Sequence, residues 1–138
     1  IGPEEAALKR RCNNLGIERM ALFPGFIPDN ELPSYYAQSD LFVLPTLYEA
    51  FGLVYVDAMA RGLPVVTTAV GGACDLVNDN NGVLVPPQDS AALGDAIIAS
   101  IQKKWDREAI AAGARKYDWE EIMTHYFSLY RSLLSPEK

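Results

Sequence analysis

Two carboxylates and a glycine stand close together in the stretch Glu49–Met59, and these residue types suit the binding of a polar ligand. Glu49 lies at the mouth of an expected helix, Gly52 falls in its first turn, and Asp57 follows Glu49 by eight residues. On an ideal helix this spacing gives about 12 Å of rise and roughly 80° of rotation, so both carboxylates can face one cleft. They could hold hydroxyls at two places along one elongated ligand. The alternative is that Glu49 complements the helix dipole and Asp57 is a solvated surface acid.

The segments around this stretch follow a strand–helix–strand pattern. Leu41–Leu44 is a short apolar run closed by a proline, the helical pattern ends at Gly62, and Pro64–Thr68 is a second buried strand that runs into Gly71 and Gly72. A βαβ crossover binds ligands beyond the carboxyl ends of its strands. A helix start at that edge offers unpaired backbone N–H groups to a phosphate or a sugar hydroxyl. The pattern therefore predicts a ligand edge at the turns that follow the two strands.

The rest of the chain alternates short apolar runs with helical patterns, which indicates an α/β fold with a parallel sheet. Further strands are expected at Met20–Phe23 and Gly82–Val85. Asp89 or Ser90 can cap a helix that reaches about Lys103. The other expected helical segments are residues 4–14, 30–39, 75–77, 106–116 and 119–134.

The composition bounds the class of protein. With 138 residues, 49% hydrophobic and 22% charged, the chain can form one globular domain with a core. The net charge of −6 argues against a nucleic-acid partner, which needs a basic face. The sequence has neither a run of 18 apolar residues nor a signal-peptide pattern, so we expect a cytoplasmic protein. Cys12 and Cys74 form no metal-binding motif, and we expect free thiols, no metal and no cofactor.

The central stretch resembles the C-terminal nucleotide-sugar-binding domain of retaining GT-B glycosyltransferases. The closest group holds bacterial mannosyl- and glucosyltransferases, sucrose synthases and glycogen synthases. The resemblance is carried by E-x-F-G-L-x3-D-A-M-A-x-G-x-P-V-V at residues 49–66 and by G-G-x-x-D at residues 71–75. It extends over about residues 1–134, and the motif is specific. The family usually has Glu where Asp57 and Asp75 stand.

The resemblance implies a site for the sugar donor at the turn before the expected helix. Glu49 would hydrogen-bond hydroxyls of the donor sugar, and Asp57 would accept hydrogen bonds from the ribose. The sugar or the diphosphate would meet the backbone N–H groups of Phe51, Gly52 and Leu53.

Two further segments would complete this donor site. Phe26 and Ile27 lie in the loop where the family packs the nucleobase, and the alternative is an ordinary loop with a buried Phe26. Gly71 and Gly72 could approach the ligand or simply turn the chain. Asp75 is interpreted as an acid in the first turn of a helix rather than as a ligand residue.

The resemblance also implies that the chain holds only part of a donor-binding domain. Laid on a doubly wound sheet of strand order 3-2-1-4-5-6, the expected strands match three to six. The first two strands and the phosphate-binding Arg and Lys of the family would precede Ile1. We therefore expect a sheet that is split, rearranged or completed by another chain. We also expect no turnover from this chain alone and only weak nucleotide binding.

We interpret residues 1–138 as the partial donor-binding domain of a retaining glycosyltransferase. It would use a UDP- or GDP-linked sugar, an N-terminal GT-B domain of the same protein, and a saccharide or lipid-linked acceptor. A GT-B epimerase is an alternative, although it needs a general acid and base where only Glu49 is available. A phosphorylase needs a lysine for pyridoxal phosphate, and none lies between Arg10 and Ile101. A noncatalytic flavodoxin-like interaction domain also remains open.

Several side chains of the C-terminal half receive no catalytic role. His125 is expected to be partly packed on its helix. Aromatic residues are expected in the core or at a domain contact, namely Tyr117, Trp119, Tyr126, Phe127 and Tyr130. Basic residues are expected on solvated helix faces, with a weak contact to acidic lipid left open, namely Lys103, Lys104, Arg107, Arg115 and Lys116.

Overall fold

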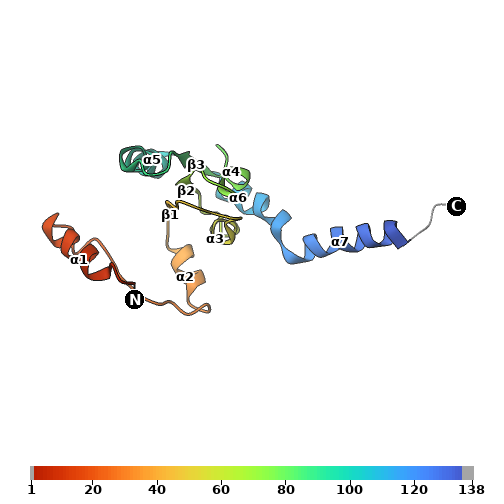
Figure 1. Cartoon of the computed structure of the whole chain (residues 1–138), viewed down its shortest axis with the longest axis horizontal. Coiled ribbons are helices and arrows are strands. Elements are labelled where there is room, and N and C mark those ends of the chain that lie inside the picture. Colours follow the sequence, from red (N-terminus) through yellow and green to blue (C-terminus); the bar gives the residue numbers. More distant parts are fainter. Residues whose placement is uncertain (1, 135–138) are drawn as a thin grey trace. The chain divides into compact units, whose positions relative to one another are not determined.

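A computed structural model of the protein describes residues 2–134. The chain forms two compact units, Ile1–Tyr35 and Tyr36–Lys138, and each is described by itself (Figure 1). Helix α2 (Leu32–Ala37) spans the junction between the units. The prediction that residues 1–138 are one partial donor-binding domain stays a prediction.

The first unit contains helix α1 (Glu5–Asn14), as the sequence predicts. Gly16 follows the end of the helix by two residues, has a left-handed backbone with φ +68°, and donates its N–H to the carbonyl of Asn13 at 3.0 Å. Lys9 pairs with Glu5 one turn earlier and lowers the pKa of the Glu5 carboxyl through a hydrogen bond and charge attraction.

The prediction of a strand at Met20–Phe23 is wrong. This segment has no regular secondary structure, and Met20 and Leu22 are 84% and 78% exposed. A strand gains its stability by pairing with a neighbour, and no extended segment pairs with this one among the described residues. An apolar run of strand length is therefore not sufficient to form a strand here.

The second unit is built on a three-stranded parallel sheet with the order β1-β2-β3. The strands are β1 (Phe42–Leu44), β2 (Val65–Thr68) and β3 (Gly82–Val85). This confirms the Rossmann-like α/β fold class. The sheet is not rearranged, because the segment Met20–Phe23 does not join it.

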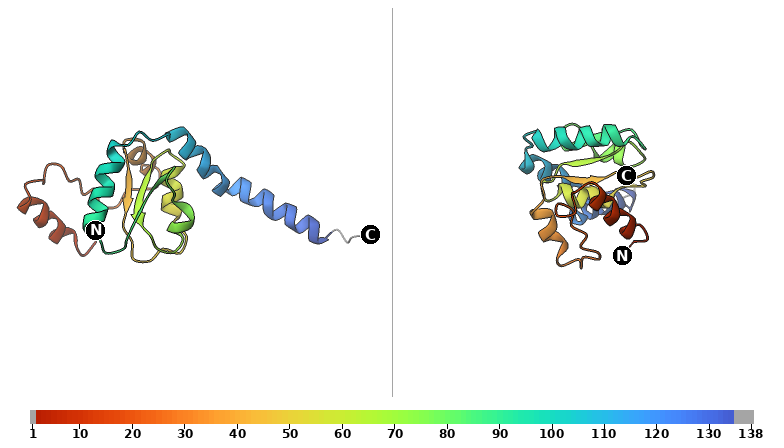
Figure 2. Two further views of the ribbon diagram at one scale, coloured as in Figure 1. Left: turned by 90° about the horizontal axis from the view of Figure 1, so that it is seen from above. Right: turned by 90° about the vertical axis from the view of Figure 1, so that its left-hand side faces the viewer.

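Helices cover both faces of this sheet (Figure 2). Helix α3 (Leu53–Met59) packs on one face and helix α5 (Ser90–Gln102) on the other. The central strand β2 is buried along its whole length, as expected for a parallel strand covered on both faces.

Helix α3 buries Tyr55, Ala58 and Met59. It begins at Leu53, directly after Gly52, whereas the sequence predicts Gly52 inside its first turn. Its end is as predicted. Gly62 stops the helix with φ +74°, and the N–H groups of residues 62 and 63 return to the carbonyls of residues 59 and 58.

The remaining helices follow the predicted order. Asp89 is the N-cap of α5 and accepts hydrogen bonds from the N–H groups of Ala91 at 3.1 Å and Ala92 at 2.9 Å. The other elements are the short helix α4 (Ala73–Leu76), helix α6 (Arg107–Ala114) with a 3₁₀ turn at Arg115–Tyr117, and helix α7 (Trp119–Leu134).

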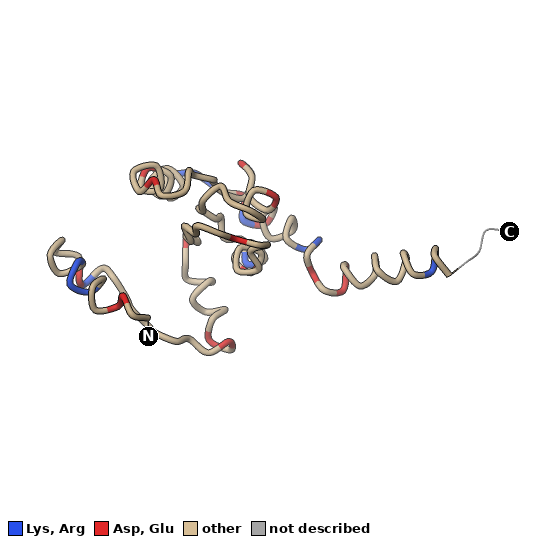
Figure 3. The backbone as a smooth tube through the Cα atoms, in the orientation of Figure 1, with Lys and Arg blue, Asp and Glu red and all other residues tan. Residues whose placement is uncertain are grey.

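Helix α7 contributes no buried residue, and its charged residues lie near its two ends (Figure 3). Of the two expected locations, the core is therefore wrong for Trp119, Tyr126, Phe127 and Tyr130, which are all exposed, and a domain contact stays a prediction. His125 is also exposed rather than partly packed, and its Nδ1 lies 2.8 Å from the carbonyl oxygen of Glu121. Within residues 2–134, no helix has the length and apolarity needed to cross a membrane.

The basic residues are exposed as predicted, but two of them also hold the fold together. Lys103 donates to the carbonyl of Asp79 at 2.8 Å. Arg107 donates to the carbonyls of Gly62 at 3.2 Å and Ser39 at 2.6 Å. These contacts join helices α5 and α6 to the loops at the amino ends of the strands.

Candidate functional site

The turns that follow β1 and β2 are in direct backbone contact. The N–H of Gly72 donates to the carbonyl of Glu49 at 3.0 Å. A Cβ added at Gly71 would lie 1.9 Å from that carbonyl oxygen, and one at Gly72 would lie 2.6 Å from the carbonyl oxygen of Ala50. Both positions therefore require glycine, because the preceding turn occupies the space of a side chain.

A pair of threonines fixes the first of these turns to the end of β2. The N–H of Thr46 donates to the hydroxyl oxygen of Thr68 at 3.1 Å, and the Thr68 hydroxyl donates back to the carbonyl of Thr46. The Thr46 hydroxyl donates to the carbonyl of Tyr48 at 2.7 Å, which closes the turn locally. The chain entering the candidate site is thus held by side chains as well as by the sheet.

Gly52 has a left-handed backbone at φ +95° and stands directly before α3. A Cβ at this position would lie 2.3 Å from Cδ2 of Tyr55, so the Gly52 backbone rests on the tyrosine ring. Leu53 follows at the first position of the helix and is 70% exposed. In the segment where the sequence predicts contacts to the sugar or diphosphate, Gly52 is therefore buried against the Tyr55 ring, whereas Phe51 and Leu53 are exposed.

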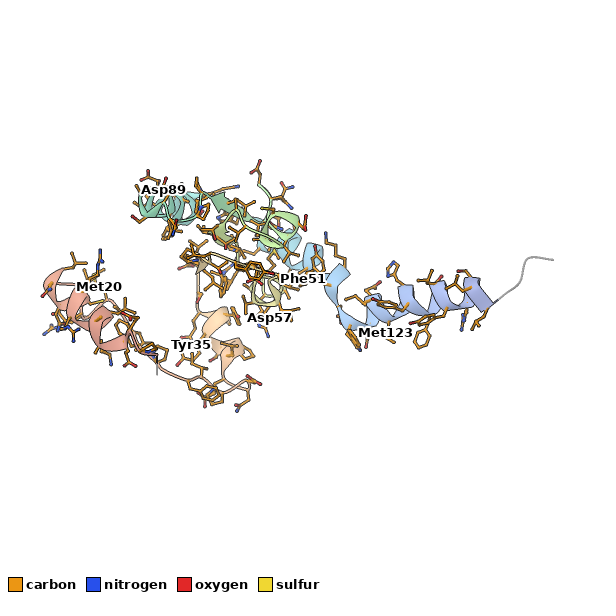
Figure 4. The ribbon with its side chains drawn as sticks, in the orientation of Figure 1. Met20, Tyr35, Phe51, Asp57, Asp89 and Met123 are labelled. Atoms are coloured by element: carbon orange, nitrogen blue, oxygen red, sulfur yellow. The ribbon has the colours of Figure 1, made fainter. Side chains whose placement is uncertain are left out.

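The two candidate carboxylates do not share one helix. Glu49 is half-buried and precedes α3, so the estimate of their separation from ideal helix geometry is wrong. Asp57 is exposed on α3, one turn beyond Leu53 and on the same side of the helix. The segment that carries Phe51 and Asp57 can be followed in Figure 4.

Asp57 has two neighbours that the sequence pattern did not identify. Tyr36 is buried on α2, and its phenol has a raised pKa because of burial first and the negative charge of Asp57 second, with Arg61 acting in the opposite direction. The Arg61 guanidinium lies 5.0 Å from the centre of the Tyr36 ring and donates to the carbonyl of Asp57 at 2.8 Å. A cation and a phenol thus adjoin the proposed ribose contact.

The side chain of Phe51 packs against another aromatic side chain of the second unit. Its ring meets the ring of Tyr117 edge-on, with the ring centres 5.8 Å apart. Only the backbone N–H of Phe51 is predicted to contact the ligand, and this ring contact is compatible with that role.

Phe26 and Ile27 belong to the first unit, so the structure describes them separately from the other candidate residues. Phe26 is 83% exposed, which makes the alternative of a buried Phe26 wrong. Ile27 is half-buried. A role for the pair in packing a nucleobase stays a prediction.

The cavities in the second unit lie beside the candidate residues rather than at them. One of about 590 Å³ is formed by the turn at residues 78–81, the segment 103–106 and helix α6, and it is lined by none of the candidate residues. A smaller one, of about 210 Å³, lies next to Thr46 and Thr68 at the carboxyl ends of the strands. None of the candidate residues lines either of these two cavities: Phe51, Leu53, Asp57 and Gly71 are exposed, Glu49 is half-buried, and Gly52 and Gly72 are buried.

The sequence reasoning also missed Tyr55 and Thr67, whose hydroxyls are hydrogen-bonded in the interior at 2.9 Å. The sequence does contain a signal for one of these two residues. Thr67 follows two valines in a strand expected to be buried, and a buried hydroxyl requires a partner. The partner itself could not be named without knowing which face of α3 meets the sheet.

Comparison with known proteins gives consistent results. Residues 1–117 match the family described as glycosyl transferases group 1. The D-inositol 3-phosphate glycosyltransferase of Corynebacterium urealyticum is 36% identical over 143 residues, which cover 96% of this chain and 34% of that relative.

Two solved structures are similar along most of the chain. Sucrose-phosphate synthase from Thermosynechococcus elongatus has a TM-score of 0.77 at 33% identity, covering 96% of this chain and 35% of that one. HepE of Anabaena, solved in complex with UDP and glucose, has a TM-score of 0.73 at 31% identity, covering 93% of this chain and 35% of that one.

The fold and these matches define the class of protein: the chain belongs to the glycosyl transferases group 1 family. It spans about a third of the length of the relatives that it matches.

Proposed function

We propose that the chain is the donor-binding part of a retaining glycosyltransferase, which moves a sugar from a UDP- or GDP-linked donor to a saccharide or lipid-linked acceptor. The observation that carries this proposal is the family match over residues 1–117, which includes every candidate donor residue. The similarity to HepE, solved with UDP and glucose, supports a nucleoside diphosphate sugar as the ligand. The group 1 match also favours a transferase over an epimerase.

Each candidate donor residue of the second unit has a proposed role. Glu49 would accept hydrogen bonds from the donor sugar, and the N–H groups of residues 51–53 would meet the sugar or the diphosphate. Asp57 is exposed and would accept hydrogen bonds from the ribose. Gly71 and Gly72 would act indirectly, since they let the turn at Glu49 pack against the end of β2.

The proposed reaction needs groups that these residues do not supply. A diphosphate leaving group requires cationic or hydrogen-bonded stabilisation where its charge develops. In the proposal, those cations come from elsewhere in the protein, and the acceptor site comes from an N-terminal domain of the same protein. No metal or other cofactor is assigned a part, and the proposed location is the cytoplasm.

Nucleotide affinity tests the proposal directly. UDP and GDP are titrated into the wild type and into Asp57→Ala, and binding is followed by calorimetry or NMR. Because hydrogen bonds to a charged group contribute substantially to binding, loss of the Asp57 carboxylate should weaken the preferred nucleotide by about tenfold. Asp95→Ala, which removes an exposed carboxylate on α5, is the matched control and should bind as the wild type does. Equal affinity in Asp57→Ala and the wild type would contradict the assigned ribose contact.

A further inference from the structure

Two hydrogen bonds in series link the end of β1 to the side chain of Tyr55 on α3. The Thr67 hydroxyl donates to the carbonyl of Leu44 at 2.7 Å and is also hydrogen-bonded to the Tyr55 hydroxyl at 2.9 Å. A hydroxyl has one proton, so with the Thr67 proton on the carbonyl, the Tyr55 proton forms the shared bond. Both side chains are completely buried.

The Tyr55 ring at the end of this series supports the candidate donor site. A Cβ at Gly52 would lie 2.3 Å and 2.6 Å from two carbons of the ring, so the Gly52 backbone lies directly on it. The N–H of Tyr55 donates to the carbonyl of Gly52 at 2.9 Å. Phe42 of β1 meets the Tyr55 ring edge-on, with the ring centres 6.2 Å apart. The ring is therefore held by a hydroxyl at its tip and an aromatic contact at its side.

We propose that Tyr55 and Thr67 are positioning residues for the donor site. Their hydrogen bond fixes the ring under Gly52, and the ring in turn fixes where the N–H groups of Gly52 and Leu53 point. This inference rests on the proposed function, because those N–H groups are the ones assigned to the sugar or diphosphate.

The use of hydroxyls, rather than an apolar pair of the same shape, is what indicates positioning. A Phe and a Val would fill nearly the same space, and removing both hydroxyls of the pair leaves neither of them buried without a partner, so that the remaining cost is the Thr67 donor lost by the Leu44 carbonyl. A hydrogen bond adds direction, because it restricts the ring to orientations that keep the two oxygens in contact. Removing it should therefore affect the turn at Gly52 more than the stability of the fold.

The test compares the wild type with Tyr55→Phe, Thr67→Val and the double variant in the full chain. Three quantities are measured: the free energy of unfolding in urea, the dissociation constant for UDP, and the hydrogen-exchange rates of the Gly52 and Leu53 amides. Thr67→Val should be destabilised, because it leaves the Tyr55 hydroxyl without its acceptor and the Leu44 carbonyl without its Thr67 donor. Tyr55→Phe should be destabilised less, because the Thr67 hydroxyl keeps its bond to Leu44, and the double variant should recover the part of the Thr67→Val loss that comes from the Tyr55 hydroxyl. UDP binding should be weakened roughly three- to tenfold in all three variants, the range expected for one hydrogen bond. Exchange at the two amides should be faster in all three.

Ile110→Val is the matched control. Ile110 is a buried apolar residue on α6, so this change lowers stability without touching the hydroxyl pair. It should leave the UDP affinity and the exchange at Gly52 unchanged, which separates positioning from a general loss of stability.

The outcomes distinguish this inference from the proposed function. A double variant that binds UDP as tightly as the wild type and has wild-type exchange at Gly52 and Leu53 overturns the positioning role. If the wild type binds neither UDP nor GDP, the proposed function fails. In that case only the hydrogen-exchange rates of the Gly52 and Leu53 amides test the positioning role. Faster rates in the double variant support it, and wild-type rates overturn it.

Discussion

The backbone N–H of Gly72 donates to the carbonyl of Glu49, and this bond joins the turn that follows β1 to the turn that follows β2. The two residues are separated in the sequence by helix α3 and strand β2, and they meet beyond the carboxyl ends of β1 and β2. The glycines at positions 71 and 72 are explained by this contact, since a side chain at either position would enter the preceding turn. Packing of the two turns therefore places the acid that is proposed to hold the donor sugar.

Gly71→Ala should destabilise the protein by at least about 2 kcal/mol, because the new Cβ clashes with the Glu49 carbonyl and the backbone at Gly71 is left-handed. Urea denaturation measures the loss. Gly94→Ala in α5 is the control: a Cβ there meets no atom within 4 Å, and the change should stabilise by about 0.5–1 kcal/mol. A Gly71→Ala protein as stable as the wild type would show that the two turns are not packed as described.

Asp89→Ala should lower the free energy of unfolding by about 1 kcal/mol, because the N–H groups of Ala91 and Ala92 lose their acceptor. The measurement is again urea denaturation. Asp95→Ala changes an exposed acid inside the same helix and should shift stability by no more than about 0.5 kcal/mol. If the two variants lose the same amount, the cap does not hold α5.

Tyr36 should make stability depend on pH in the alkaline range. Burial, and then the charge of Asp57, raise the pKa of its phenol above the ordinary value of 10.0. The folded state therefore favours the neutral form, and this stabilisation is complete below pH 10 and is lost as pH rises from 10 through the folded pKa. The decline in unfolding free energy between about pH 9 and 11 should be smaller for Tyr36→Phe than for the wild type. Parallel curves for the two proteins would rule out the raised pKa.

Much of the second unit could be predicted from the sequence because its signals are local. Strand β3 and helix α7 have the predicted bounds. The first is a short apolar run between a turn rich in Asn and two prolines, and the second follows a helical repeat. The sequence also identifies Gly62 as the end of the α3 pattern, because glycine is the residue that most readily adopts the left-handed conformation found there.

The errors concern features that depend on distant partners. Met20–Phe23 has strand composition but no strand beside it. The geometry assumed for Glu49 and Asp57 failed because the left-handed Gly52 delays the start of α3. Tyr55 and Thr67 were missed because pairing of two buried hydroxyls is decided by how α3 packs on the sheet. Local patterns located the donor turn, but they could not describe what supports it.

Chemical-shift mapping of ¹⁵N-labelled protein with UDP tests the central claim most directly. We predict changes at residues 49–53, at Asp57 and at Gly71 and Gly72. We predict no change at residues 78–81 or 103–106, which line the cavity of about 590 Å³. Changes confined to that cavity, or no change with either UDP or GDP at millimolar concentration, would contradict a donor site at the turn that follows β1.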